Sequence, residues 1–227
     1  MDGWLPFLGL GISLAGPALL VLVLRYGIVP SSVLTRRLFN AIGLWILTCL
    51  VAFVLLAEQK SFISIGLGPI SRSNVLWGLA GGAAGILAFP VCMVVLRIFR
   101  VPVAPPGDTN GFMSLSLWVR LLILITAAVT EEVLYRGYPI TTLQAVGGSL
   151  TFAILLPLAV FVIVHLPGWG WSHLVFVTAA GGVLTLLFVL KGSLWSNIIA
   201  HAVIDAVPLV ILPSLAGRAG SRRFPAG

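Results

Sequence analysis

The sequence predicts an all-α fold, a polytopic transmembrane helix bundle of about seven spans. Of the 227 residues, 59% are hydrophobic and only 8% are charged, and the mean hydropathy is +1.15. Soluble globular domains carry roughly 25% charged residues, so this composition excludes that class. The apolar residues are gathered into runs of about twenty, which is the length that an α-helix needs to cross a bilayer.

Three of the expected spans lie in the N-terminal half. They cover residues 4–24, 38–57 and 74–98, and a proline-rich connector follows the third. The third span contains Gly78, Gly81, Gly82 and Gly85, and small residues of this kind let membrane helices approach each other closely. We therefore expect residues 1–110 to form an N-terminal group of transmembrane helices with the connector at its end.

Four further spans are expected in residues 111–217, at 115–143, 149–166, 174–190 and 193–215. Residues 218–227 form a short basic tail. The net charge of +7 comes from thirteen Lys and Arg that are scattered singly or in pairs beside apolar runs. Because they form no basic stripe, they indicate membrane topology rather than nucleic-acid binding.

Three of the six acidic residues fall inside expected spans, and histidines accompany them. Glu131 and Glu132 lie in the 115–143 span, His165 ends the next one, and His201 and Asp205 lie in the last. An ionised side chain at the centre of a membrane helix costs at least about 2.5 to 3.5 kcal/mol, so such residues mark functional sites by default. These three helices together predict one polar constellation.

Helical spacing predicts different roles for the two adjacent glutamates. Glu132 and Arg136 are four positions apart and share one face, where they can form a charge-assisted pair. Glu131 points about 100° away from Glu132. We therefore expect Glu132 and Arg136 to be supporting residues and Glu131 to be free for chemistry.

The constellation suits hydrolysis of an amide or ester bond. Glu131 can take a proton from water, while His165 either holds that water or binds a metal that acidifies it. Phe161 lies one turn before His165, where it can pack against the imidazole as a further supporting residue. His201 and Asp205 are four positions apart and can stabilise an oxyanion, which for Asp205 requires a proton or a bound cation.

These motifs resemble those of the CPBP family of intramembrane proteases, which includes type 2 CAAX prenyl proteases and bacteriocin-processing (Abi) enzymes. Residues 131–137 resemble the family's EExxxRG motif, residues 161–165 its FxxxH motif and residues 201–205 its HxxxN/D motif, in the same order. The resemblance covers residues 115–215. It implies a four-helix catalytic core that cleaves membrane-associated proteins or peptides, prenylated ones included.

Carried over by position, the resemblance implies that Glu131 activates the water with His165, and that His201 and Asp205 form the oxyanion site. Asp205 stands where the eukaryotic prenyl-protein proteases have Asn. Members of the family are described both as metalloproteases and as metal-independent glutamate proteases. The cofactor is therefore either a divalent metal such as zinc, with His165, His201 and Glu131 as its ligands, or none.

Two other functions fit part of the pattern. A non-catalytic member of the same fold would act in bacteriocin immunity or bind a partner membrane protein. A proton-coupled transporter would use the buried carboxylates as a relay, although the sequence has no internal repeat of the kind that many transporters show. For the protease, we expect a multi-pass protein of a prokaryotic cytoplasmic membrane with a membrane-embedded or lipid-anchored substrate.

Overall fold

The computed structural model describes residues 3–27, 32–103 and 109–215, and all regular secondary structure within these ranges is helical. The elements are α1 (Leu5–Tyr26), α2 (Val33–Ala57), the 3₁₀ turn η1 (Phe62–Ile65), α3 (Arg72–Ile98), α4 (Thr109–Ser114), α5 (Leu117–Glu132), the π-helical turn η2 (Val133–Gly137), α6 (Tyr138–Ala145), α7 (Leu150–Trp169), α8 (Trp171–Lys191), α9 (Leu194–Ala206) and the π-helical turn η3 (Val207–Ile211). The predicted all-α class is confirmed. The basic tail at 218–227 lies outside the described residues.

Six helical segments are long and apolar enough to cross a membrane: α1, α2, α3, α7, α8 and Leu194–Leu215, which contains α9 and η3. The span expected at 115–143 is divided into α5, η2 and α6. With 16 residues, α5 is shorter than a membrane-crossing helix, but the chain continues through η2 directly into α6. The protein is thus an integral membrane protein, and its fourth expected span is interrupted by a π turn.

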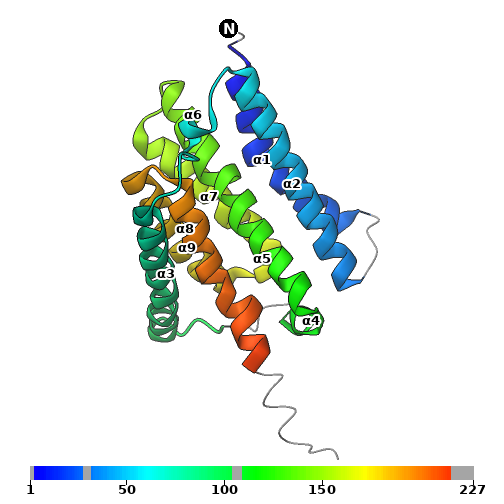
Figure 1. The fold of residues 1–227 in the computed structure, drawn as a ribbon. Helices are drawn as coiled ribbons and strands as arrows, with labels where there is room; N and C mark the ends of the chain where they lie inside the picture. The colour runs from blue at the N-terminus through cyan, green and yellow to red at the C-terminus, as the bar shows by residue number, and fades with distance from the viewer. Residues whose placement is uncertain (1–2, 28–31, 104–108, 216–227) are drawn as a thin grey trace, which may run out of the picture.

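The helices that follow α4 lie between α3 on one side and the α1–α2 pair on the other (Figure 1). Helix α2 packs against α5, and α1 contacts α6 and α7. On the opposite side, α3 lies along α8 and α9. The N-terminal helices therefore flank the later ones within one bundle.

The glycines of α3 face α9. A Cβ added to Gly82 would lie 2.6 Å from the Cβ of Val203, and one added to Gly78 would lie 2.6 Å from the Cβ of Ile199. Both distances are too short for a side chain, so the two backbones approach as closely as the glycines predicted. Because α9 carries His201, this contact helps to set the position of a candidate site residue.

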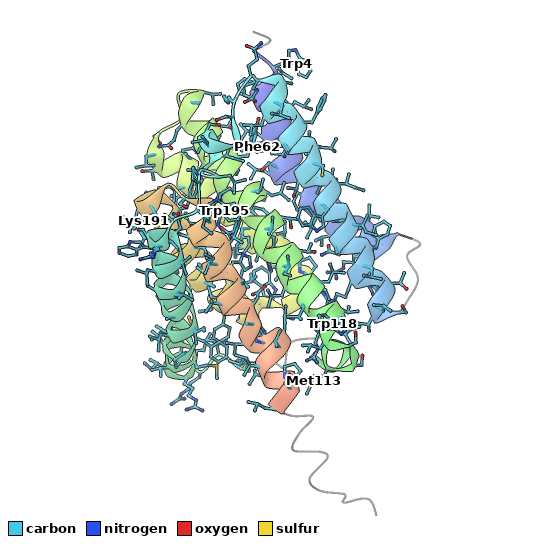
Figure 2. The ribbon with its side chains drawn as sticks, viewed as in Figure 1. Trp4, Phe62, Met113, Trp118, Lys191 and Trp195 are labelled. Carbon is cyan, nitrogen blue, oxygen red and sulfur yellow. The ribbon has the colours of Figure 1, made fainter. Side chains whose placement is uncertain are left out.

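Polar contacts also fix the beginning of α9. The Trp195 indole Nε1 donates to the Gly68 carbonyl at 2.7 Å. The Lys191 ammonium lies 3.8 Å from the centre of the Trp77 ring, within cation–π distance. Figure 2 shows Lys191 and Trp195 at the same end of the bundle. The loop before α3 and the second turn of α3 thus hold the end of α8 and the start of α9.

We expect Gly82→Ala to destabilise the protein, because the new methyl group would be forced against Val203 of α9. Overpacking of this kind costs about 1–3 kcal/mol, which thermal unfolding in detergent would detect as a lower melting temperature. The matched control is Gly182→Ala on α8, since a Cβ there would meet nothing within 4 Å. Equal melting temperatures for the two variants would contradict the close packing of α3 on α9.

Candidate active site

Glu132 is the centre of a buried polar network. Its side chain is 0% exposed. Oε1 accepts hydrogen bonds from Arg136 Nη1 at 2.9 Å and from His201 Nδ1 at 2.7 Å, and Oε2 accepts one from Asn197 Nδ2 at 2.9 Å. The predicted Glu132–Arg136 pair is confirmed. Three donors compensate for the lost hydration of a carboxylate that the protein encloses completely.

Arg136 extends this network to α7 and α8. Its Nε donates to Thr185 Oγ1 at 3.4 Å and its Nη2 donates to the Gly181 carbonyl at 3.3 Å. The guanidinium carbon lies 4.3 Å from the centre of the Phe161 ring, which adds a cation–π contact. Residues from the α5–η2 segment, α7, α8 and α9 therefore meet at one ion pair.

The π turn η2 brings Arg136 to this position. It begins directly after Glu132, and all five of its residues are buried. Turns of this kind are rare and frequently occur at functional sites. The Leu134 carbonyl within the turn accepts a hydrogen bond from the Ser13 hydroxyl of α1. A Cβ on Gly137 would lie 2.9 Å from the Ile65 carbonyl oxygen and 2.6 Å from Leu194 Cδ1. The leucine can move but the backbone carbonyl cannot easily do so, which favours glycine at this position.

Glu131, His201 and Asp205 converge at the edge of the network. His201 Nε2 lies 3.9 Å from Glu131 Oε2 and 3.5 Å from Asp205 Oδ2. The side chains of Glu131 and Asp205 are 16% and 26% exposed, whereas Glu132 is completely enclosed. The two adjacent glutamates are thus separated as their spacing predicted, with Glu132 inside the network and Glu131 at its accessible edge.

The protonation of His201 depends on its acidic neighbours, because Nδ1 is hydrogen-bonded to Glu132 and Nε2 faces Glu131 and Asp205. Nδ1–H donates to Glu132, because an ionised carboxylate only accepts. Nε2 faces oxygen atoms of both Glu131 and Asp205, and ionised oxygens repel a nitrogen lone pair. Either the ring carries both protons or one of the two carboxyl groups holds the second one.

His165 stands on α7 and makes no direct hydrogen bond to Glu131, His201 or Asp205. Its Nδ1–H donates to the Phe161 carbonyl at 2.6 Å, so in the neutral ring Nε2 is the acceptor. The ring centres of Phe161 and His165 are 4.5 Å apart, which confirms the predicted packing of the two side chains.

In the part of the chain that the structure describes, no three His, Cys, Asp or Glu side chains are grouped so that they could hold a metal ion. A metal site formed by His165, His201 and Glu131 stays a prediction. His201 uses Nδ1 for Glu132, and His165 uses Nδ1 for a backbone carbonyl. In this arrangement both Nδ1 atoms are engaged by protein acceptors, which leaves the two Nε2 atoms for other partners.

Sequence reasoning missed Asn197 and the partners on α8. Asn197 is fully buried and also donates from Nδ2 to the Leu184 carbonyl at 2.7 Å. It lies one helical turn before His201, so the face that carries residues 197, 201 and 205 could have revealed it. The Gly181 carbonyl and the Thr185 hydroxyl had no comparable signal, because every helix contains such groups.

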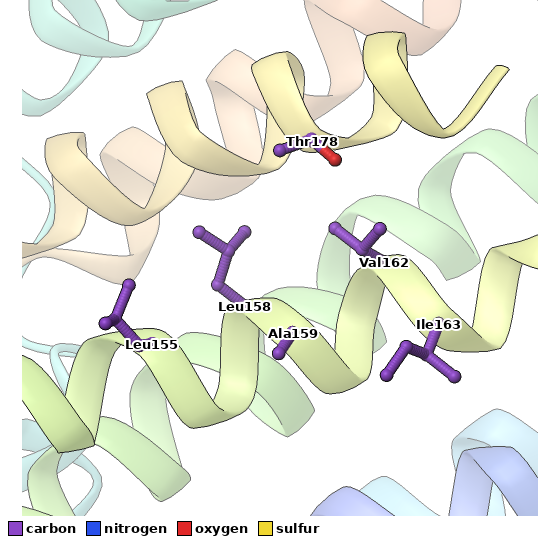
Figure 3. A pocket seen from close by; sticks show the side chains of 6 residues that line it. All are labelled: Leu155, Leu158, Ala159, Val162, Ile163 and Thr178. Carbon is purple, nitrogen blue, oxygen red and sulfur yellow. The ribbon is translucent and has the colours of Figure 1, made fainter. Parts of the chain in front are cut away.

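An apolar hollow of about 380 Å³ lies between α7 and α8, beside the site but separate from it (Figure 3). Its lining residues are Leu155, Leu158, Ala159, Val162, Ile163 and Thr178. None of them belongs to the polar network. The hollow and the site share two helices, since α7 also carries Phe161 and His165 and α8 also carries Gly181 and Thr185.

The chain was compared with known proteins. Residues 113–207 match a protein-family model described as type II CAAX prenyl endopeptidase Rce1-like. No curated protein and no solved structure gives a significant match. The matched range contains every residue of the buried network and of its accessible edge that is named above. Residues 113–207 are therefore similar to the Rce1-like family of type II CAAX prenyl endopeptidases, in agreement with the resemblance of the motifs to those of the CPBP proteases.

Proposed function

We propose that the protein is an intramembrane endopeptidase that hydrolyses peptide bonds of membrane-associated proteins or peptides, prenylated ones included. The observation that carries this proposal is the position of Glu131, which lies at an accessible edge beside His201 and Asp205 while its neighbour Glu132 is fully neutralised. The Rce1-like match supports the reaction class. The proposed location is a prokaryotic cytoplasmic membrane.

Glu131 is the general base in this proposal. It accepts a proton from the attacking water, and His165 Nε2 accepts the water's second hydrogen bond, because Nδ1 is already engaged by Phe161. After the tetrahedral intermediate forms, Glu131 returns the proton to the leaving amine. The hydrogen bonds of Glu132 to Arg136, Asn197 and His201 are kept throughout the reaction.

His201 is the proposed oxyanion donor. With both ring nitrogens protonated, Nδ1–H stays on Glu132 and Nε2–H points to the edge where the substrate carbonyl would lie. Asp205, 3.5 Å from Nε2, balances the charge of the imidazolium. Asp205 therefore acts indirectly, through His201. An Asn side chain at this position would instead donate a hydrogen bond to the oxyanion itself.

Glu131→Gln is expected to lower the cleavage rate by about 10²- to 10⁴-fold, the usual contribution of a general base. The melting temperature should stay close to that of the parent, since Glu131 makes no short hydrogen bond. Cleavage is measured in detergent with fluorescent lipid-anchored peptides. Parent-like cleavage by this variant would remove Glu131 from the mechanism, and binding without cleavage by the parent would favour the non-catalytic alternative.

Glu132→Gln should act mainly on stability. It leaves the buried Arg136 guanidinium without its anionic partner, and breaking a buried pair in this way costs about 3–5 kcal/mol. The measurement compares the melting temperatures of Glu132→Gln and Glu131→Gln, which remove an enclosed and an accessible carboxylate at adjacent positions. Glu132→Gln should melt at the lower temperature. If both variants melted at the same temperature, the structural role of Glu132 would be wrong.

Chelation is expected to leave the cleavage rate unchanged, because the described donors do not group around a metal position. The measurement compares cleavage before and after dialysis against 1,10-phenanthroline, with a known zinc protease as the positive control. Loss of activity that added zinc restores would show that His165, His201 and Glu131 rearrange to bind the ion.

A further inference from the structure

The Leu134 carbonyl in the π turn η2 has no donor from its own helix. In a π turn the N–H of residue i+5 donates to the carbonyl of residue i, and the Tyr138 N–H accordingly donates to the Val133 carbonyl. The next donor in this register would be residue 139, which is a proline and has no N–H. Leu134 is 0% exposed, so solvent does not reach it. A buried carbonyl in this state needs a partner from elsewhere in the fold.

Ser13 of α1 is that partner. Its hydroxyl donates to the Leu134 carbonyl, and Ser13 is itself 0% exposed. Gly9 lies one turn earlier on the same face of α1, and a Cβ added there would overlap the ring and hydroxyl of Tyr138. That hydroxyl donates to Glu58 Oε1 at 2.7 Å. The N-terminal helices therefore contact the turn at its second residue and again directly after its end.

Arg136 stands two residues after Leu134 and connects the turn to His201. Its Nη1 donates to Glu132 Oε1 at 2.9 Å, and the same oxygen accepts from His201 Nδ1 at 2.7 Å. The π and α registers differ by one residue, so loss of the π register would turn Arg136 about the helix axis by up to about 100°. The guanidinium would then leave Glu132, and the His201 ring would lose its fixed neighbour.

Tyr135 connects the same turn to His165. Its ring packs edge-on against the Phe161 ring, with the two centres 5.2 Å apart. The Phe161 ring in turn lies against the His165 imidazole, and the Phe161 carbonyl accepts the hydrogen bond from His165 Nδ1. Both histidines that the proposed mechanism uses are thus aligned through side chains of one turn.

We infer that Ser13 is a positioning residue of the active site. Its hydroxyl holds the π register by donating to the carbonyl that Pro139 leaves unpaired. The register then aligns the two histidines through the side chains of the turn. The inference rests on the proposed function for its effect on catalysis, whereas the hold on the turn is measured without any substrate.

The first measurement is the hydrogen exchange of backbone amides in residues 133–140, by mass spectrometry in detergent. Ser13→Ala leaves a buried carbonyl unpaired, which should raise exchange in this segment by about tenfold or more. The matched control is Thr48→Val on α2. It removes a buried hydroxyl whose acceptor, the Leu44 carbonyl, belongs to the same helix, and it should leave exchange in 133–140 unchanged. Parent-like exchange in Ser13→Ala overturns the inference.

The second measurement separates kcat from KM for cleavage of fluorescent lipid-anchored peptides. Ser13→Ala should lower kcat by about ten- to a hundredfold, because a misplacement of about 1 Å at a catalytic site has an effect of that size. KM should stay parent-like, since no contact with the substrate is removed, and Thr48→Val should keep both constants. A purely structural role would leave the kcat of the folded protein unchanged. Raised exchange with parent-like kcat therefore refutes the positioning role.

Pro139→Ala tests the register directly. An alanine N–H at position 139 can donate to the Leu134 carbonyl in the π register, so Ser13→Ala should raise exchange less in this background than in the parent. Equal effects in the two backgrounds overturn the inference. If Ser13→Ala unfolds the parent protein, a folded Ser13→Ala/Pro139→Ala double variant supports the inference, and unfolding in both backgrounds contradicts it.

The two measurements separate this inference from the proposed function. Raised exchange in Ser13→Ala, together with a parent that cleaves none of the peptides, refutes the endopeptidase and keeps Ser13 as the residue that holds the turn. An active parent whose Ser13→Ala variant shows unchanged exchange or unchanged kcat keeps the endopeptidase and refutes the positioning role.

Discussion

A carboxylate inside a lipid-embedded bundle is stable only when other protein groups replace the water around it, and the Glu132 carboxylate meets that requirement with three donors. Those donors come from the π turn and from α9, and Arg136 connects them to α7 and α8. Four separate helical segments are therefore aligned by one anion. If any of them shifted, a buried charge would lose a partner.

This arrangement divides polar residues into those that maintain the structure and those available for chemistry. Glu132, Arg136 and Asn197 have their charges and N–H groups engaged inside the bundle. His201 belongs to both groups, since Nδ1 contacts Glu132 while Nε2 faces Glu131 and Asp205. The His201 imidazole thus joins the buried network to the accessible edge. The position of the reacting groups therefore depends on residues that never contact the substrate.

The sequence was sufficient for the membrane class, the helical spans, the Glu132–Arg136 pair and the packing of Phe161 on His165, because each depends on hydropathy or on spacing along one helix. It could not predict that the fourth span contains a π turn, since Val133–Gly137 has ordinary helix-forming residues and the turn is stabilised by Ser13 from a distant helix. Periodicity along α9 places Asn197 on the face of His201 and Asp205. Its contact with Glu132, like that of Thr185 with Arg136, depends on the packing between helices, which periodicity does not encode. The roles of Glu131, His165, His201 and Asp205 in catalysis stay predictions.

The hydrogen bond from Ser13 to the Leu134 carbonyl bears on how small a working fragment of this protein can be. All three family motifs lie after residue 111. The π turn η2, which lies between Glu132 and Tyr138 and carries Arg136, nevertheless receives its hydrogen bond from Ser13 of α1. The Tyr138 hydroxyl, directly after that turn, likewise donates to Glu58 at the end of α2. A fragment that began at residue 111 would retain every residue of the motifs and lose both of these partners. The region that is recognisable by family is thus smaller than the region that must fold together.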